Sequence, residues 1–118
     1  MTDRVRTAAL QARLWYWQRV SAMVLALCVV VHLATIVFAV RGGLSAGEIL
    51  ARTQGSWTFA AFYLVFVVAV TVHAPIGLAR IAEEWLGWRG RSSALLAALF
   101  GLTLLALGLR AVWAVFAR

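Results

Sequence analysis

Residues 20–40 read VSAMVLALCVVVHLATIVFAV and contain no charged side chain. A helix of this length is about 30 Å long, at 1.5 Å per residue, which matches the hydrocarbon core of a bilayer. Two further apolar runs, over residues 57–79 and 93–116, reach the same length. The sequence therefore predicts an all-α fold, an integral membrane bundle of three transmembrane helices.

The composition supports a membrane protein. Of the 118 residues, 64% are hydrophobic and 13% are charged. A soluble domain of this size needs a more polar surface, so we expect one membrane domain over residues 1–118. The first run is too long for a secretory signal peptide and has no small-residue cleavage site. Cys28 is the only cysteine, so the chain cannot form an intrachain disulfide.

The arginines predict the orientation of the spans. The net charge is +7, but the arginines lie at the ends of the runs, which favours membrane topology over nucleic-acid binding. Seven arginines lie before the first run or after the second, and four lie on the other side, namely Arg41, Arg52, Arg110 and Arg118. We therefore expect a multi-pass protein of the cell inner (plasma) membrane with a cytoplasmic N-terminus.

Two shorter segments and one proline complete the predicted layout. Ser45 and Glu48 form a capping-box pattern, which predicts a short helix through Arg52 on the outer surface, with a plain polar loop as the alternative. Residues 7–18 are expected to form a short amphipathic helix lying on the inner membrane surface. Pro75 should kink the second span and free a carbonyl about one turn earlier.

The only two histidines, His32 and His73, each lie inside a membrane-spanning run. An ionisable side chain at membrane depth is costly and is usually kept because it contacts something that lipid cannot supply. Imidazole is the commonest metal ligand and a frequent haem ligand. A hydrogen bond to a carbonyl of a neighbouring helix is the alternative for either residue. Histidines on two consecutive spans favour cofactor ligation.

Residues on the helical face of His73 fit such a role. Gly77 and Arg80 follow His73 on the same face. A glycine lets a flat macrocycle approach the backbone, and an arginine can meet a propionate or a quinone oxygen. Helix packing is the alternative for Gly77, and a topological anchor is the alternative for Arg80. On the first run, Ser21 and His32 lie on one stripe, which suits either a cofactor crevice or a tight helix interface.

The depths of the two histidines differ. His32 lies about 20 Å from the inner end of the first span, whereas His73 lies about 10 Å from that end. Axial ligands of one iron must lie at nearly the same depth. The sequence therefore predicts that His73 belongs to an inner site and His32 to a separate outer site or to none.

Two stretches resemble the cytochrome b membrane-anchor subunits of succinate dehydrogenase (respiratory complex II) and fumarate reductase. Residues 18–22, QRVSA, are similar to the H-R-x-S-G segment of that family's first span. Residues 73–77, HAPIG, are similar to its H-x-x-x-G segment in the second span. Gln18 replaces the family's histidine, Ala22 replaces its glycine, and Trp15 stands where the best-known members have a quinone-site serine. The usual arginine after the second motif falls one position late, at Arg80.

The resemblance implies that His73 is an axial ligand of haem b and that Arg19 and Ser21 lie at a quinone pocket on the inner side. It also implies flavoprotein and iron–sulfur subunits, which would carry out the dicarboxylate chemistry, so this chain would not itself be catalytic. In two-haem relatives, histidines of the first and second spans serve an outer and an inner haem. His32 would then serve a second haem, completed by a second membrane-anchor subunit or a second copy of this chain.

Two other functions remain open from the sequence. One is a structural anchor without haem, as in some fumarate reductases, in which both histidines are packing residues. The other is a small proton-coupled transporter subunit in which the histidines relay protons. The three runs contain no acidic residue, which disfavours a transporter.

Overall fold

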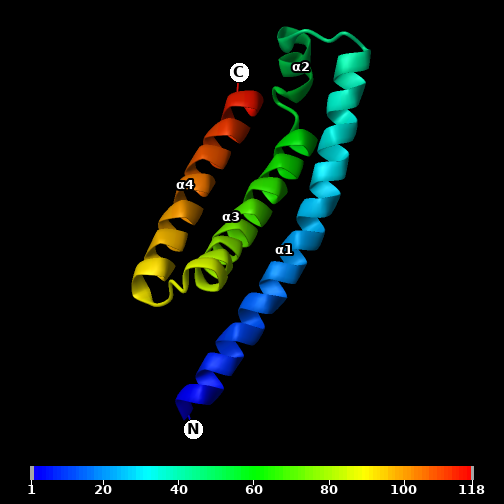
Figure 1. Cartoon of the computed structure of the whole chain (residues 1–118). Helices are drawn as coiled ribbons and strands as arrows, with labels where there is room; N and C mark the ends of the chain where they lie inside the picture. Colours follow the sequence, from blue (N-terminus) through cyan, green and yellow to red (C-terminus); the bar gives the residue numbers. More distant parts are fainter. Residues whose placement is uncertain (1, 118) are drawn as a thin grey trace.

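The computed structural model describes residues 2–117 and contains four helices in this part of the chain (Figure 1). They are α1 (Thr2–Arg41), α2 (Ala46–Thr53), α3 (Trp57–Leu86) and α4 (Arg91–Phe116). Three of them, α1, α3 and α4, are long and apolar enough to cross a membrane. The predicted three-span bundle is confirmed, and the chain is a multi-pass membrane protein. Met1 and Arg118, the latter used in the arginine count, lie outside the described residues.

Helix α1 runs the full length of the molecule. Its 40 residues correspond to about 60 Å, and the longest dimension of the molecule is 60 Å. The segment over residues 7–18 is helical as predicted, but it is not a separate helix. It forms the first part of α1 and extends past the α3–α4 loop in the direction of the span (Figure 1). The reason is that α1 contains no glycine or proline that would interrupt it.

The predicted short helix is present as α2. The hydroxyl oxygen of Ser45 accepts from the backbone N–H of Glu48 at 3.2 Å, and the Glu48 carboxylate accepts from the backbone N–H of Ser45 at 2.7 Å. The helix ends at Thr53, whose hydroxyl donates to the carbonyl of Val115 at 2.8 Å. Because the last carbonyls of a helix lack partners within it, this bond also stabilises the end of α4.

Helix α3 lies between α1 and α4 (Figure 1). Two glycines of α4 allow the close approach to α3. A Cβ atom on Gly101 would lie 2.7 Å from Cγ of Pro75, and one on Gly108 would lie 2.6 Å from Cγ1 of Val67. Helix α3 continues through Pro75 without a break. Glycine therefore sets the α3–α4 spacing, as small residues commonly do in membrane bundles.

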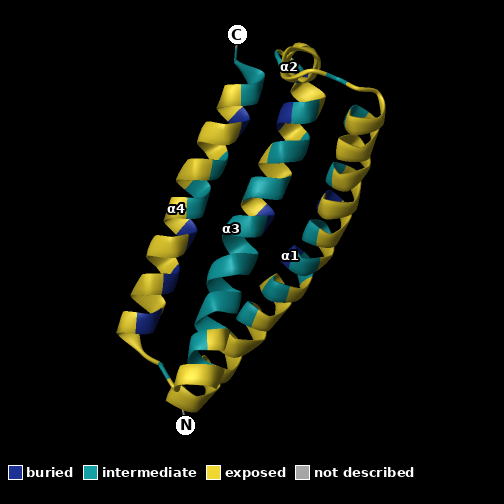
Figure 2. Ribbon diagram, turned by 45° about the horizontal axis from the view of Figure 1, so that its top comes forward, coloured by how far each residue is buried: buried dark blue, intermediate teal, exposed yellow. Residues whose placement is uncertain are grey.

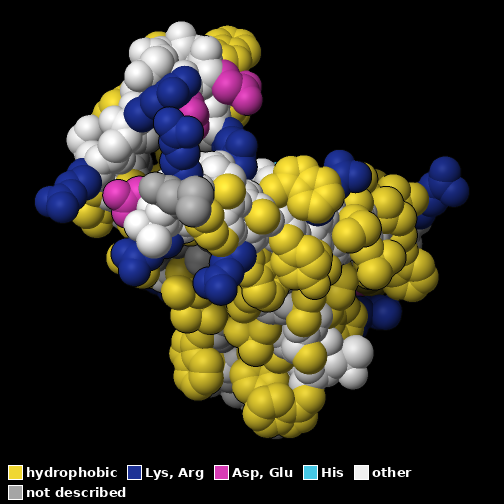
Figure 3. All heavy atoms as spheres, turned by 90° about the horizontal axis from the view of Figure 1, so that it is seen from below, with side chains coloured by type: hydrophobic (Ala, Val, Ile, Leu, Met, Phe, Trp, Pro, Cys, Tyr) yellow, Lys and Arg dark blue, Asp and Glu magenta, His cyan; other side chains and the backbone are white. Residues whose placement is uncertain are grey.

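Small side chains form the enclosed part of the bundle, whereas the outward faces of α1 and α4 are exposed (Figure 2). The buried residues include Ser21, Cys28, Ala60, Ala69, Ser93 and Ala97. Viewed from the end where the N-terminus lies, hydrophobic side chains cover much of the surface (Figure 3). In a membrane protein these apolar faces contact lipid or other subunits.

Candidate functional site

The α1–α3 interface brings Ser21 and His73 together. The hydroxyl oxygen of Ser21 lies 3.3 Å from Nδ1 of His73, and Ser21 is only 5% exposed. The Ser21 hydroxyl also lies 3.1 Å from the backbone carbonyl of Gln18, to which it donates. Because the contact links two helices, it holds the His73 ring against α1.

Gly77, one turn after His73, faces the side chain of Gln18. A Cβ atom on Gly77 would lie 3.3 Å from Nε2 of Gln18. Oε1 of Gln18 is enclosed and has no hydrogen-bond partner among residues 2–117. Leaving such an acceptor without a partner costs about 1–3 kcal/mol. The amide therefore occupies the space that Gly77 provides.

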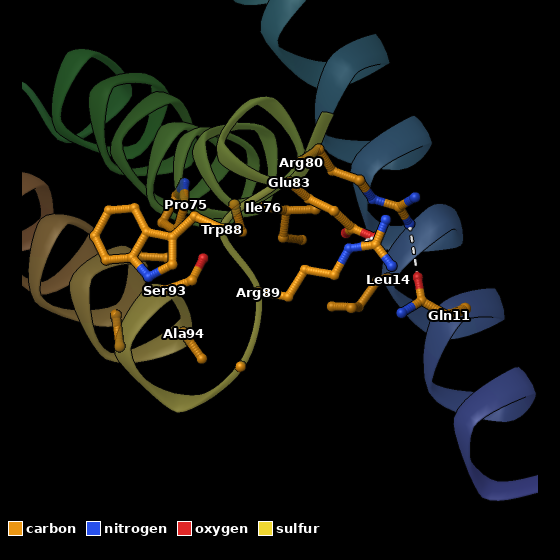
Figure 4. Close-up of a pocket in the computed structure, with 14 residues that line it drawn as sticks. Gln11, Leu14, Pro75, Ile76, Arg80, Glu83, Trp88, Arg89, Ser93 and Ala94 are labelled. Carbon is orange, nitrogen blue, oxygen red and sulfur yellow. Dashed lines mark hydrogen bonds and ion pairs between the residues drawn. The ribbon is translucent and has the colours of Figure 1, made fainter. Parts of the chain in front are cut away.

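Arg80 reaches α1 rather than His73. Its guanidinium donates to Oε1 of Gln11 at 3.2 Å, as Figure 4 shows. Both residues line a cavity of about 490 Å³ formed by α1, α3, the α3–α4 loop and the start of α4. An ion pair between Glu83 and Arg89, with Oε1 and Nε 3.2 Å apart, lies at the same cavity. Arg80 thus places a positive charge at the end of the bundle where the α3–α4 loop lies.

Arg19 and Ser21, predicted to share a quinone pocket, do not converge in this chain. Positions two apart on a helix point in nearly opposite directions. Ser21 is buried against α3, whereas Arg19 is exposed and its guanidinium carbon lies 5.9 Å from the centre of the Trp15 ring. A shared pocket would need other subunits or a different arrangement of α1.

His32 occupies an aromatic environment. Its ring centre lies 5.8 Å from that of Tyr63 and 5.8 Å from that of Phe66, with both pairs edge to face. Nδ1 of His32 is enclosed and forms no hydrogen bond within the described chain. Cavities of about 280 Å³ and 220 Å³ adjoin the ring, the second one bordered by α2.

The two histidines lie at different levels of the bundle. Ser21, which contacts His73, precedes His32 by eleven residues on α1, which corresponds to about 16 Å along the helix axis. This separation agrees with the predicted difference in depth. Within residues 2–117, no three side chains of the His, Cys, Asp and Glu types come together. A haem iron needs only one or two side-chain ligands, so this arrangement is compatible with haem.

The sequence did not indicate the aromatic pair around His32 or the enclosed amide oxygen of Gln18. Tyr63 and Phe66 are three residues apart, so they lie on one face of α3. That spacing is visible in the sequence, but the pairing of this face with His32 depends on the register between α1 and α3. Gln18 lies three residues before Ser21, and the same helical face could have indicated its position.

The family model described as succinate dehydrogenase/fumarate reductase transmembrane subunit matches residues 3–113. No curated protein and no solved structure gives a significant match. The match extends from the start of α1 into the last turn of α4 and includes both histidines. The chain therefore belongs to the family of succinate dehydrogenase/fumarate reductase transmembrane subunits.

Proposed function

We propose that this chain is the haem b-binding membrane anchor of a succinate:quinone oxidoreductase and that it contributes to a quinone site. The observation that carries the proposal is the arrangement of His73. Its Nδ1 contacts Ser21, whereas its Nε2 forms no hydrogen bond to any residue in the described part of the chain and is not among the enclosed atoms. A histidine held through one nitrogen with the other nitrogen open is typical of a metal ligand.

The residues around His73 fit a haem. Nε2 of His73 would be the axial ligand, and Arg80 would supply a positive charge for a propionate at the loop end of the bundle. Gly77 lies one turn after His73 and faces the Gln18 amide, whose enclosed oxygen has no hydrogen-bond partner among residues 2–117. A bound haem b would supply one-electron transfer between its ferric and ferrous states. A second axial ligand, if present, would come from a partner chain.

The quinone site is proposed around Arg19. This side chain is exposed on α1, so a quinone bound there would lie between this chain and its partners. The guanidinium would donate to a quinone carbonyl and stabilise the negative charge that develops on reduction, most strongly in a low-dielectric setting. Ser21 is already engaged by His73, which supports a role for this serine at the histidine rather than at the quinone.

The partners follow from the family. A transmembrane subunit of this family implies flavoprotein and iron–sulfur subunits, which would dock at the end of the bundle formed by the start of α1 and the α3–α4 loop. Arginines gather at this end, including Arg4, Arg6, Arg89 and Arg91. We propose that this end faces the cytoplasm at the inner membrane. The exposed apolar faces of α1 and α4 would contact a second anchor subunit or a second copy.

The first test is a reduced-minus-oxidised spectrum of the complex purified with its partner subunits. We expect a b-type cytochrome band whose intensity stays in constant ratio to the amount of this chain through purification. A fully assembled complex that oxidises the dicarboxylate but shows no b-type band would contradict haem binding. It would leave the alternative of a haem-free structural anchor.

The quinone role is tested by Arg19→Leu, with Arg13→Leu as the matched control. Both are arginines in the first half of α1 and both are exposed. We expect Arg19→Leu to lower quinone reduction while dye reduction by the soluble subunits stays unchanged, and Arg13→Leu to leave both activities near the wild type. Unchanged quinone reduction in the Arg19 variant would remove this residue from the site.

A second haem at His32 is a further candidate, favoured by the two cavities that adjoin its ring. The remaining ligands would come from a partner chain, because His73 lies at another level of the bundle. A redox titration that resolves two b-type components, one of them removed by His32→Ala, would support this assignment. A single component that persists in His32→Ala would assign His32 to packing.

A further inference from the structure

The Ser21 hydroxyl lies between two groups and has a single proton. A serine hydroxyl carries one proton and two acceptor lone pairs. The backbone carbonyl of Gln18, 3.1 Å away, can only accept that proton. Nδ1 of His73, at 3.3 Å, is a donor or an acceptor according to the tautomer of the ring. Both contacts are hydrogen bonds at the same time only when the hydroxyl donates to Gln18 and Nδ1–H of His73 donates to the hydroxyl.

We infer that Ser21 is a positioning residue that fixes the tautomer and the orientation of His73. With the proton on Nδ1, the neutral ring carries its free lone pair on Nε2, the nitrogen that forms no bond within residues 2–117. The reverse direction, with Ser21 donating to Nδ1, would put the proton on Nε2 and block that nitrogen as a ligand. This inference rests on the proposed role of His73 as an axial haem ligand.

Burial makes the bond effective. Ser21 is 5% exposed, so water cannot readily replace its oxygen as the acceptor. The ring torsion of a histidine is broad by itself, and a fixed acceptor on α1 selects one orientation. An acceptor on the far nitrogen of a ligating imidazole also raises the basicity of the ligating nitrogen. A more basic ligand stabilises ferric over ferrous iron, so Ser21 should lower the midpoint potential of the haem.

The test compares Ser21→Ala, Ser21→Thr and Thr35→Ala in the complex purified with its partners. Thr35 is a matched control because it lies on the same helix and its hydroxyl also donates to a carbonyl three residues earlier, that of His32, at 2.7 Å. Its hydroxyl forms no hydrogen bond to α3. Haem b content is measured by pyridine haemochrome, the midpoint potential by redox titration, and the ligand field by electron paramagnetic resonance of the ferric haem.

We expect Ser21→Ala to keep haem but to show a higher midpoint potential and shifted resonance g-values. Ser21→Thr, which restores a hydroxyl, should return both values toward the wild type, and Thr35→Ala should change neither. If Ser21→Ala does not assemble, the near-isosteric Ser21→Cys should shift the potential in the same upward direction, because a thiol is a weak acceptor.

Wild-type potential and g-values in a haem-loaded Ser21→Ala complex would overturn the inference, and so would a loss of haem that Ser21→Thr does not rescue. Failure of the proposed function has a different signature. In that case the wild-type complex lacks a b-type haem, or His73→Ala retains it with an unchanged spectrum.

Discussion

The two histidine levels of this chain share a residue type and a membrane setting but differ in what surrounds the ring. His73 meets a buried hydroxyl on α1 and keeps Nε2 open. His32 meets two aromatic rings, and its Nδ1 has no partner in the described residues. A polar partner aligns a ring for ligation, whereas an aromatic environment only packs it. The surroundings therefore make His73 the stronger candidate ligand of the two, a distinction that membrane depth alone does not give.

The largest difference between the two levels is expected in haem content when each imidazole ring is removed in turn. His73→Ala should cost the assembled complex essentially all of its inner haem, because Nε2 is the proposed ligand and no other histidine of this chain lies at that level. His32→Ala should leave the inner haem in place. The measurement is pyridine haemochrome per chain. Equal loss in both variants would remove the distinction between the two levels.

The packing of α4 against α3 should be sensitive to a larger residue at either of its two contact glycines. Gly101→Ala would place Cβ 2.7 Å from the Pro75 ring, and Gly108→Ala would place it 2.6 and 2.8 Å from both methyl groups of Val67. Forced overpacking typically costs about 1–3 kcal/mol. We expect both variants to lower the thermal midpoint of the purified complex. The Gly108 variant should show the larger loss of thermal stability. Rotating the Val67 side chain would only exchange one methyl group for the other and would not relieve the clash.

Gly47→Ala serves as the control for this pair, because a Cβ there would meet only the Ser45 hydroxyl at 3.9 Å. Its thermal midpoint should stay near the wild-type value. An unchanged midpoint in Gly101→Ala and Gly108→Ala would show that α3 and α4 are farther apart than described.

A smaller effect is expected from Gly77→Ala, next to His73. The added Cβ would lie 3.3 Å from the end of the flexible Gln18 side chain, which can move by a few tenths of an ångström. Stability should change by less than about 1 kcal/mol, whereas the haem spectrum should shift because the neighbouring amide moves. An unshifted spectrum would show that the haem does not approach this face of α3.

The smallest effect is expected from Arg80→Gln. The bond from Arg80 to Gln11 is exposed, and such surface contacts contribute at most about 1 kcal/mol. Assembly and haem content should remain near the wild type, with a modest change in midpoint potential if the charge neighbours a propionate. A haem loss comparable to that of His73→Ala would assign Arg80 a larger role than its position suggests.

The sequence was sufficient for the spans and for the separation of the histidines, because both follow from apolar run length and helical rise. The capping box of α2 was also readable, since its bonds are local to Ser45 and Glu48. The prediction that the helix over residues 7–18 is separate from the first span was wrong, because α1 is continuous there. Amphipathic patterning alone does not end a helix that lacks glycine and proline.

The contacts between helices were not predictable from spacing alone. Ser21 and Arg19 are two residues apart, and the family resemblance assigned both to one pocket. The helical turn separates them, and the register of α1 against α3 pairs Ser21 with His73. The same register places Tyr63 and Phe66 around His32. A register between helices depends on side-chain packing across the interface, which no single segment contains.

The most direct test of the central claim is chemical rescue in the His73→Gly complex, with His32→Gly as the matched control. Removing the ring leaves a space beside Ser21 that free imidazole can fill. The account predicts that His73→Gly lacks the inner b-type band and regains it when imidazole is added, whereas His32→Gly keeps that band throughout. A His73→Gly complex that retains an unaltered b-type band without imidazole would contradict the assignment of His73 as the haem ligand.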